Sequence, residues 1–205
     1  MNYIEIKNFF NKASEYWNDR IEHNHNKIRE YLSYINIREK QQILDVGTGT
    51  GIMLDFLLPE LTDKAEITAV DISPGMLEKA RSNYTDSRVC FREVNVETDN
   101  LPRDHYDLVI MYSVFPHLEF KKQTLSTLIS SMKQNGELCI MHSKSREEIN
   151  NMHKSLGPPV SSHMLPPVSE LKQLAEHQGK LSQRTVETLV AKSEDTGYLY
   201  LAKVH

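Results

Sequence analysis

Apolar residues near the start of the chain recur every three or four positions, as they do on one face of a helix. They fall within residues 9–17 and again within residues 28–35, and residues 18–26 between them are polar enough for a loop or a helix start. We therefore expect residues 1–38 to form a helical cap at the N-terminus.

From residue 42 the pattern changes to short apolar runs that alternate with stretches of helical periodicity. Ser73 and Pro74 suit the N-cap and the first position of one of these helices, and Asn135-Gly136 is a turn signal ahead of a strand. The alternation predicts a Rossmann-like, doubly wound α/β fold, with helices on both faces of a mostly parallel sheet. The expected strands are residues 43–46, 67–70, 89–94, 106–112 and 137–141, and the expected helices are residues 52–58, 73–84, 121–132 and 168–178.

The last part of the chain predicts an antiparallel hairpin. Residues 182–190 and 198–204 alternate or run apolar, and the polar stretch 193–197 supplies a turn between them. The hairpin completes a seven-stranded sheet in which one strand is antiparallel. Residues 142–167, with their proline pairs, are the least regular segment, and we expect an inserted lid there within a single domain of residues 1–205.

The composition fits one α/β domain, with 205 residues of which 39% are hydrophobic. No apolar run approaches the ~18 residues that a membrane-spanning helix needs, so no membrane insertion is expected. The start of the chain lacks the pattern of a secretory signal, and Cys90 and Cys139 read as two buried, unpaired thiols, which fit the cytoplasm. The net charge of −4, without a basic block, argues against a nucleic-acid partner.

Three glycines, Gly47, Gly49 and Gly51, follow the first predicted strand. Glycine tolerates positive φ and lets backbone amides approach a ligand closely, and the next helix start favours an anionic group. Asp71 ends the second predicted strand, where its carboxylate can accept from both hydroxyls of a ribose. Asp45 ends the first strand, near where a cofactor ammonium could sit. Together these features favour the methyl donor S-adenosylmethionine.

A dinucleotide cofactor is the main competing interpretation. Its G-x-G-x-x-G/A motif needs a small residue at the position where this chain has Ile52. Dinucleotide-binding folds also usually start near the motif, whereas about 40 residues precede it here. A tight turn that holds no ligand is the third interpretation.

The glycine motif and the segment around Asp71 resemble two motifs of the class I S-adenosylmethionine-dependent methyltransferases. The resemblance is strongest to the small-molecule branch, which includes quinone-biosynthesis enzymes. Residues 43–51 match the first motif of the family and residues 69–77 match the second. The resemblance implies that Asp71 holds the ribose, while Ile72 and Met76 pack on the adenine.

Later motifs of the family are present with departures. Asn95 stands where the third motif usually has an acid, and its amide can still accept from the adenine amine. The fourth motif matches residues 106–115, and many members continue with two histidines where this chain has Pro116-His117. The chain lacks the Pro-Pro-aromatic and Pro-Cys motifs of enzymes that methylate nucleobases. The residues implied for donor binding are Asp45, Gly47, Thr48, Gly49, Gly51, Asp71, Ile72, Met76, Asn95, Val96 and Ser113.

Methyl transfer from a sulfonium uses an activated donor, so the protein mainly positions the reactants and excludes water. A base is needed only when the acceptor is a poor nucleophile. His117 and His142 are the candidate bases, because each follows the carboxyl end of a strand, where open α/β sheets bind ligands. For the acceptor we expect contacts from Tyr16, Trp17, Tyr112, His153 and His163.

The histidines of residues 142–163 leave alternatives open. They fit a solvated loop, or a metal site of His142, Glu148, His153 and His163, although their spacing is too loose for a metal to be an expected cofactor. We expect an enzyme that methylates O, N or C of a small molecule, as a monomer or homodimer. The alternatives are a non-catalytic module that senses a metal or ligand, and a protein or RNA methyltransferase.

Overall fold

The structure is a computed structural model that describes residues 3–205. Its seven strands form one sheet in the order β3-β2-β1-β4-β5-β7-β6. Neighbouring strands are parallel, except that β7 runs antiparallel to both β5 and β6. The predicted Rossmann-like sheet with a C-terminal hairpin is therefore confirmed. The strands are β1 (Gln42–Val46), β2 (Glu66–Asp71), β3 (Val89–Glu93), β4 (Tyr106–Tyr112), β5 (Met132–His142), β6 (Val186–Glu194) and β7 (Gly197–Val204).

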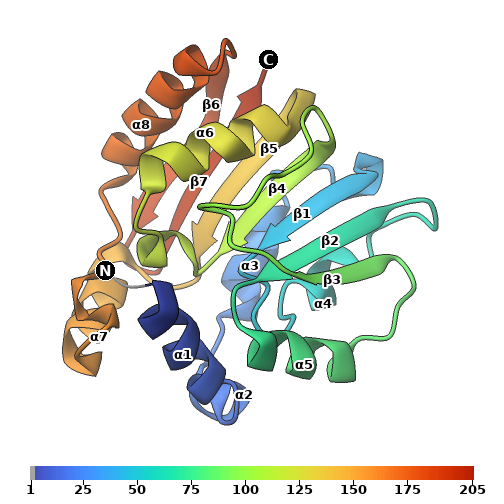
Figure 1. Cartoon of the computed structure of the whole chain (residues 1–205). Helices are drawn as coiled ribbons and strands as arrows, with labels where there is room; N and C mark the ends of the chain where they lie inside the picture. The colour runs from blue at the N-terminus through green and yellow to red at the C-terminus, as the bar shows by residue number, and fades with distance from the viewer. Residues whose placement is uncertain (1–2) are drawn as a thin grey trace.

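Helices cover both faces of the sheet (Figure 1). One face packs against α6 and α8 through Leu128 and Leu171, and the other packs against α3 and α4 through Ile28 and Leu54. The helices are α1 (Tyr3–Ala13), α2 (Trp17–Arg20), α3 (His25–Leu32), α4 (Leu54–Leu57), α5 (Pro74–Asn83), α6 (Lys121–Ser131), α7 (Arg146–Leu156) and α8 (Val168–Leu181), with single 3₁₀ turns η1 (Ile37–Glu39), η2 (Phe115–His117) and η3 (Val160–Ser162).

The central strands β1 and β4 are buried on both sides. Their alternate side chains enter two separate cores, one on each face of the sheet, which explains why both strands read as continuous apolar runs. Val46 and Met111 belong to one core, and Ile43 and Ile110 to the other. This packing holds the carboxyl ends of β1 and β4 side by side, at the edge of the sheet where the glycine motif lies.

Strand β5 differs from the sequence prediction. Asn135-Gly136 was expected to be a turn ahead of the strand, but both residues lie inside β5, which begins at Met132. Asn135 has a φ of 65°, and the pairing of β4 with β5 shifts register between Tyr106 and Leu108. The residues between Met132 and Glu137 thus form an irregularity within β5 and do not end the strand.

Two further expectations were wrong in detail. Strand β6 begins at Val186 instead of residue 182, because α8 continues to Leu181. Cys90 was expected to be buried, but it is exposed on the edge strand β3, whereas Cys139 in the central strand β5 is buried.

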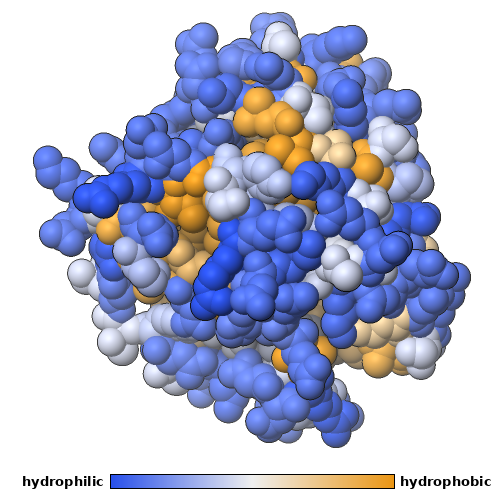
Figure 2. All heavy atoms as spheres, turned by 180° about the vertical axis from the view of Figure 1, so that it is seen from behind, coloured by the Kyte–Doolittle hydropathy of each residue, from blue (hydrophilic) through white to orange (hydrophobic). Residues whose placement is uncertain are grey.

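The back of the molecule is mainly hydrophilic, with apolar side chains showing in separate patches (Figure 2). Within residues 3–205, no helix is both long and apolar enough to cross a membrane.

Candidate active site

The loop between β1 and α4 requires glycine for two different reasons. Gly47, Gly49 and Gly51 have φ values of +67°, +57° and +99°, which side chains rarely tolerate. A Cβ at Gly47 would lie 2.5 Å from Cγ2 of Val114, so this glycine also allows close packing. A Cβ at Gly49 would meet nothing within 4 Å. The Gly49 backbone therefore faces open space.

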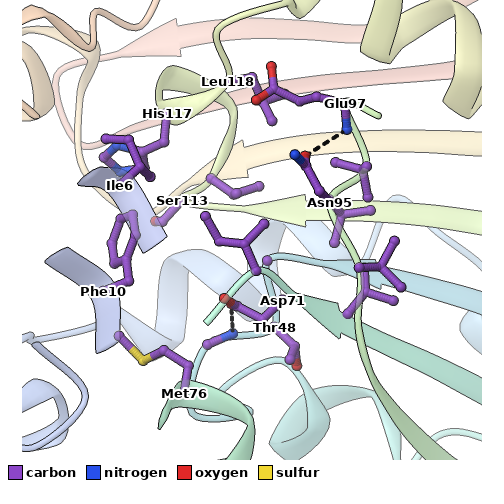
Figure 3. Close-up of a pocket in the computed structure, with 18 of the residues that line it drawn as sticks. Ile6, Phe10, Thr48, Asp71, Met76, Asn95, Glu97, Ser113, His117 and Leu118 are labelled. Atoms are coloured by element: carbon purple, nitrogen blue, oxygen red, sulfur yellow. Dashed lines mark hydrogen bonds between the residues drawn. The ribbon is translucent and has the colours of Figure 1, made fainter. Parts of the chain in front are cut away.

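Asp71 connects the end of β2 to this loop. Its Oδ2 accepts a hydrogen bond from the Gly49 backbone N–H at 2.9 Å (Figure 3). Its Oδ1 accepts one from the Ser73 N–H at 2.8 Å. Burial raises the pKa of Asp71 to about 6, against the opposing effect of these N–H groups. The remaining lone pairs of the carboxylate are available to a ligand in the cavity that Asp71 lines.

Asp45 lies beneath the loop with 1% of its surface exposed. Apart from the Thr48 side chain, neither of its carboxylate oxygens has a hydrogen-bond partner among the described residues. Burial raises the pKa of Asp45 to about 7, the Thr48 side chain opposes this shift, and the nearby charge of Asp71 adds to it. A buried carboxylate with so few partners is costly, so this position is suited to a cation close by. The ammonium and sulfonium of S-adenosylmethionine are such cations, and the site therefore fits this cofactor.

A cavity of about 260 Å³ opens beyond the loop, at the carboxyl ends of β1, β2 and β4. Asp45 and Gly51 lie outside its lining and do not border the open space. The other residues predicted for donor binding all line it: Gly47, Thr48, Gly49, Asp71, Ile72, Met76, Asn95, Val96 and Ser113.

The N-terminal helices form a further wall of the cavity. The side-chain oxygen of Asn11 accepts hydrogen bonds from the Ser73 hydroxyl at 2.7 Å and the Gly75 N–H at 3.0 Å, which fixes α1 against the start of α5. The Thr50 hydroxyl donates to Asn18 at 2.7 Å, which joins the glycine loop to α2. The cap is thus attached to both motifs.

Aromatic side chains form part of the cavity lining. The ring of Phe10 packs edge-on against Trp17, with 5.8 Å between centroids, and against His117 at 5.1 Å. Nearby, Nδ1 of His23 and the hydroxyl of Tyr112 lie 2.9 Å apart. Of the residues predicted for the acceptor, Trp17, Tyr112 and His163 line this cavity, whereas Tyr16 does not.

Four histidines lie at this part of the cavity, two of them in its lining and two buried behind it. Nδ1 of His117 lies 2.9 Å from Nδ1 of His163, and the His153 ring lies 4.8 Å from the His117 ring. His117 and His163 line the cavity, and His153 and His142 are buried behind them. Burial lowers the pKa of His163 to about 4 and that of His142 to about 3, and it holds the pKa values of His117 and His153 below the usual range.

The metal hypothesis gains no support from this cluster. Within residues 3–205, no group of three or more His, Cys, Asp or Glu side chains is arranged to hold a metal ion. Glu148 instead caps α7, where its carboxylate accepts from the Ser145 N–H at 2.8 Å in a capping box.

Sequence reasoning missed part of the lining. Helix α1 contributes side chains from its apolar face, and His23 and the segment after His117 add more. The helical periodicity indicated that α1 has an apolar face, but it could not show that this face covers a ligand cavity. The missed lining residues include Tyr3, Ile6, Phe10, His23, Glu119 and Phe120.

Comparison with known proteins finds similarity to methyltransferases. A family model described as "Methyltransferase domain" matches residues 44–138, from the glycine motif to β5. Over these residues the chain is similar to methyltransferases that use S-adenosylmethionine, and its seven-stranded fold is the one that such enzymes have.

Two relatives show how much of a longer protein is matched. The chain is 35% identical over 64% of its length to a malonyl-[acyl-carrier protein] O-methyltransferase of Anoxybacillus flavithermus, covering 49% of that protein. It is 30% identical over 66% of its length to a ubiquinone biosynthesis O-methyltransferase of Rickettsia typhi, covering 58% of it. The chain therefore spans about half the length of these curated relatives.

Solved structures agree on the fold. A chain of the solved "Complex between the Haloferax volcanii Trm112 methyltransferase activator and the putative methyltransferase" superposes with a TM-score of 0.73 at 16% identity, over 98% of this chain and 96% of that one. A methyltransferase from Aquifex aeolicus gives 0.68 at 20% identity, over 86% and 89%.

Proposed function

We propose that this protein transfers a methyl group from S-adenosylmethionine to an oxygen of a small molecule. One observation carries the proposal: the glycine loop and Asp71 line a cavity that aromatic side chains also line, and the buried carboxylate of Asp45 comes directly before that loop. The names of the relatives, a malonyl-[acyl-carrier protein] and a ubiquinone biosynthesis O-methyltransferase, support oxygen as the atom that is methylated.

Different residues of the chain would bind different parts of the methyl donor. Asp71 accepts from the ribose hydroxyls, while Ile72 and Met76 pack on the adenine, and the charge of Asp45 balances the cationic end of the donor. When bound, S-adenosylmethionine supplies an activated methyl group. Its reactivity leaves the protein mainly the tasks of aligning the acceptor and keeping water away.

The acceptor would enter between the cap of α1 and α2 and residues 142–167, which we propose to be a lid. Phe10, Trp17 and Tyr112 line the space that remains beyond the donor. The oligomeric state of the protein, monomer or homodimer, and its cytoplasmic location stay predictions.

The direct test is a screen of small phenols, alcohols and carboxylic acids, malonyl thioesters included, with methyl-labelled S-adenosylmethionine. We expect label in at least one acceptor with wild type, and at least tenfold less with Asp71→Ala. A purified protein that binds the donor but labels none of the acceptors would contradict the proposal.

A further inference from the structure

Two imidazole rings from distant parts of the chain share one hydrogen bond at the edge of the cavity. His117 belongs to η2 after β4, and His163 follows η3 in the segment 142–167. Their Nδ1 atoms lie 2.9 Å apart. One nitrogen must donate and the other accept, so only one of the two can carry a proton. The neutral pair therefore has two possible arrangements of protons, with the shared proton on Nδ1 of His117 or on Nδ1 of His163.

The arrangement adopted determines where a lone pair is left. If His117 donates through Nδ1, its Nε2 carries no proton and can accept one. After that uptake the contact between the two Nδ1 atoms is unchanged. A second proton would put two N–H groups face to face, so the pair takes up one proton and no more. His153 holds the second ring in place, because its Nδ1 donates to the His163 backbone carbonyl.

The groups around the pair keep it neutral. Burial and the charges of His153 and Lys121 lower the pKa values of both rings, and only Glu119 opposes the shift, at His163. Lys121 itself is held by the carbonyl oxygens of Pro116 and Leu118. Among the described residues, the cavity lining contains no Lys or Arg. A carboxylate acceptor would therefore meet no Lys or Arg side chain in the lining, and the nearby Lys121 ammonium is already bound by two carbonyl oxygens.

The wall beside the pair is apolar. Phe10 packs on the His117 ring, and Trp17 packs on Phe10. This environment favours an uncharged, apolar molecule over an ion. Such a molecule can be methylated at oxygen only through a hydroxyl group, whose proton must leave.

We propose that the acceptor is a neutral hydroxyl group on an apolar molecule, that His117 takes its proton, and that His163 and His153 are positioning residues. The proposal rests on the proposed function. The acceptor oxygen forms a bond to the donor methyl carbon while the carbon–sulfur bond breaks, and that electron pair stays on sulfur. The hydroxyl proton passes to Nε2 of His117. The oxygen becomes strongly acidic as the bond forms, so a weak base suffices.

The arrangement of protons is tested without any substrate. In ¹⁵N-histidine NMR we expect His117 to carry its proton on Nδ1 and to resist protonation at neutral pH. His163→Leu removes the acceptor and should abolish this tautomer preference. His163→Asn keeps an oxygen near the position of Nδ1 and should restore it, and the exposed His177→Leu is the matched control. Unchanged His117 signals in His163→Leu would overturn the proposal.

The acceptor class is tested with phenol and benzoate, which have similar size and different charge. Each is added to the complex with S-adenosylhomocysteine, whose binding is first confirmed for every variant by calorimetry. We expect phenol to shift the His117 signals, and phenol methylation to fall roughly 10²-fold in His163→Leu and recover in His163→Asn. Preferential binding of benzoate would overturn the inference while leaving donor binding intact. Thermal stabilisation by Zn²⁺ that disappears in His163→Leu would identify a metal site instead.

Discussion

The backbone N–H of Gly49 donates a hydrogen bond to Oδ2 of Asp71, with 2.9 Å between nitrogen and oxygen. This bond joins the glycine loop after β1 to the end of β2. The same carboxylate also accepts from the Ser73 N–H at the start of α5. Asp71 therefore shapes the loop and offers its remaining lone pairs to a ligand. The two family motifs form one site because this side chain connects them.

The first prediction concerns Asp71→Ala. It removes charge-assisted hydrogen bonds to a ribose, worth about 1.5–3 kcal/mol, so S-adenosylhomocysteine should bind about tenfold or more weakly. Calorimetry measures the affinity, and thermal melting corrects for the lost loop contacts. The exposed Asp195→Ala serves as the control. An affinity equal to wild type would mean that the ribose is held elsewhere.

Two glycine variants should separate packing from ligand approach. Gly47→Ala combines a positive φ, which costs about 1–2 kcal/mol, with a Cβ placed 2.5 Å from the Val114 side chain, an overpacking cost of about 1–3 kcal/mol. Gly49→Ala carries the φ cost alone and directs its methyl group into open space. Chemical denaturation should show the larger stability loss in Gly47→Ala. An equal loss in both variants would contradict this account of the loop.

Donor binding should weaken in acid. Burial raises the pKa of Asp45 to about 7 and that of Asp71 to about 6. Both carboxyls must be ionised to hold a cationic, hydroxyl-rich ligand, so affinity should fall as the pH drops through this range. Binding near neutral pH should also release protons, because the ligand favours the ionised forms. Calorimetry in buffers of different ionisation enthalpy measures that release, and proton uptake would be the opposite of what we expect.

The buried histidines should make the folded state sensitive to acid. The pKa of His142 is lowered to about 3, whereas an unfolded chain protonates its histidines near pH 6.5. Between these values the unfolded state binds more protons, so stability falls as the pH decreases, by up to about 1.4 kcal/mol per pH unit for each such histidine. Asp45 and Asp71 have raised pKa values, and they oppose this trend equally in wild type and variant.

His142→Leu isolates the contribution of one ring. The variant removes two buried nitrogens that have no partner among the described residues, so it should lose less stability than wild type between about pH 6.5 and 5. Urea denaturation across this range gives the difference. The exposed His177→Leu should keep the slope of wild type. A steeper loss in His142→Leu would indicate that His142 is charged in the folded state.

The sequence correctly predicted the features that depend on neighbouring residues in the chain. The glycine loop and Asp71 depend on a few consecutive residues at strand ends, and their geometry agrees with the pattern. The contact between His117 and His163 spans 46 positions, and it depends on how residues 142–167 fold back onto η2. No periodicity contains that information. The same holds for Phe10, which enters the cavity because Asn11 anchors α1 to α5.

Strand β5 shows a second limit. Asn135-Gly136 has the composition of a turn, and the pairing of β5 with β4 is interrupted there, between Met132 and Glu137. Strand β5 continues because β7 pairs with it from Gly136 onward, while Asn135 keeps the positive φ of a turn residue. Cys90 illustrates the same point, because an apolar run does not reveal that its strand lies at the edge of the sheet.

The most direct test of the central claim is calorimetric titration of the wild-type protein with S-adenosylhomocysteine near neutral pH. The account predicts saturable binding at a single site at or below about 1 mM ligand, weakened about tenfold or more in Asp71→Ala. An absence of detectable binding at millimolar ligand would contradict the claim that this loop and its acid hold the methyl donor.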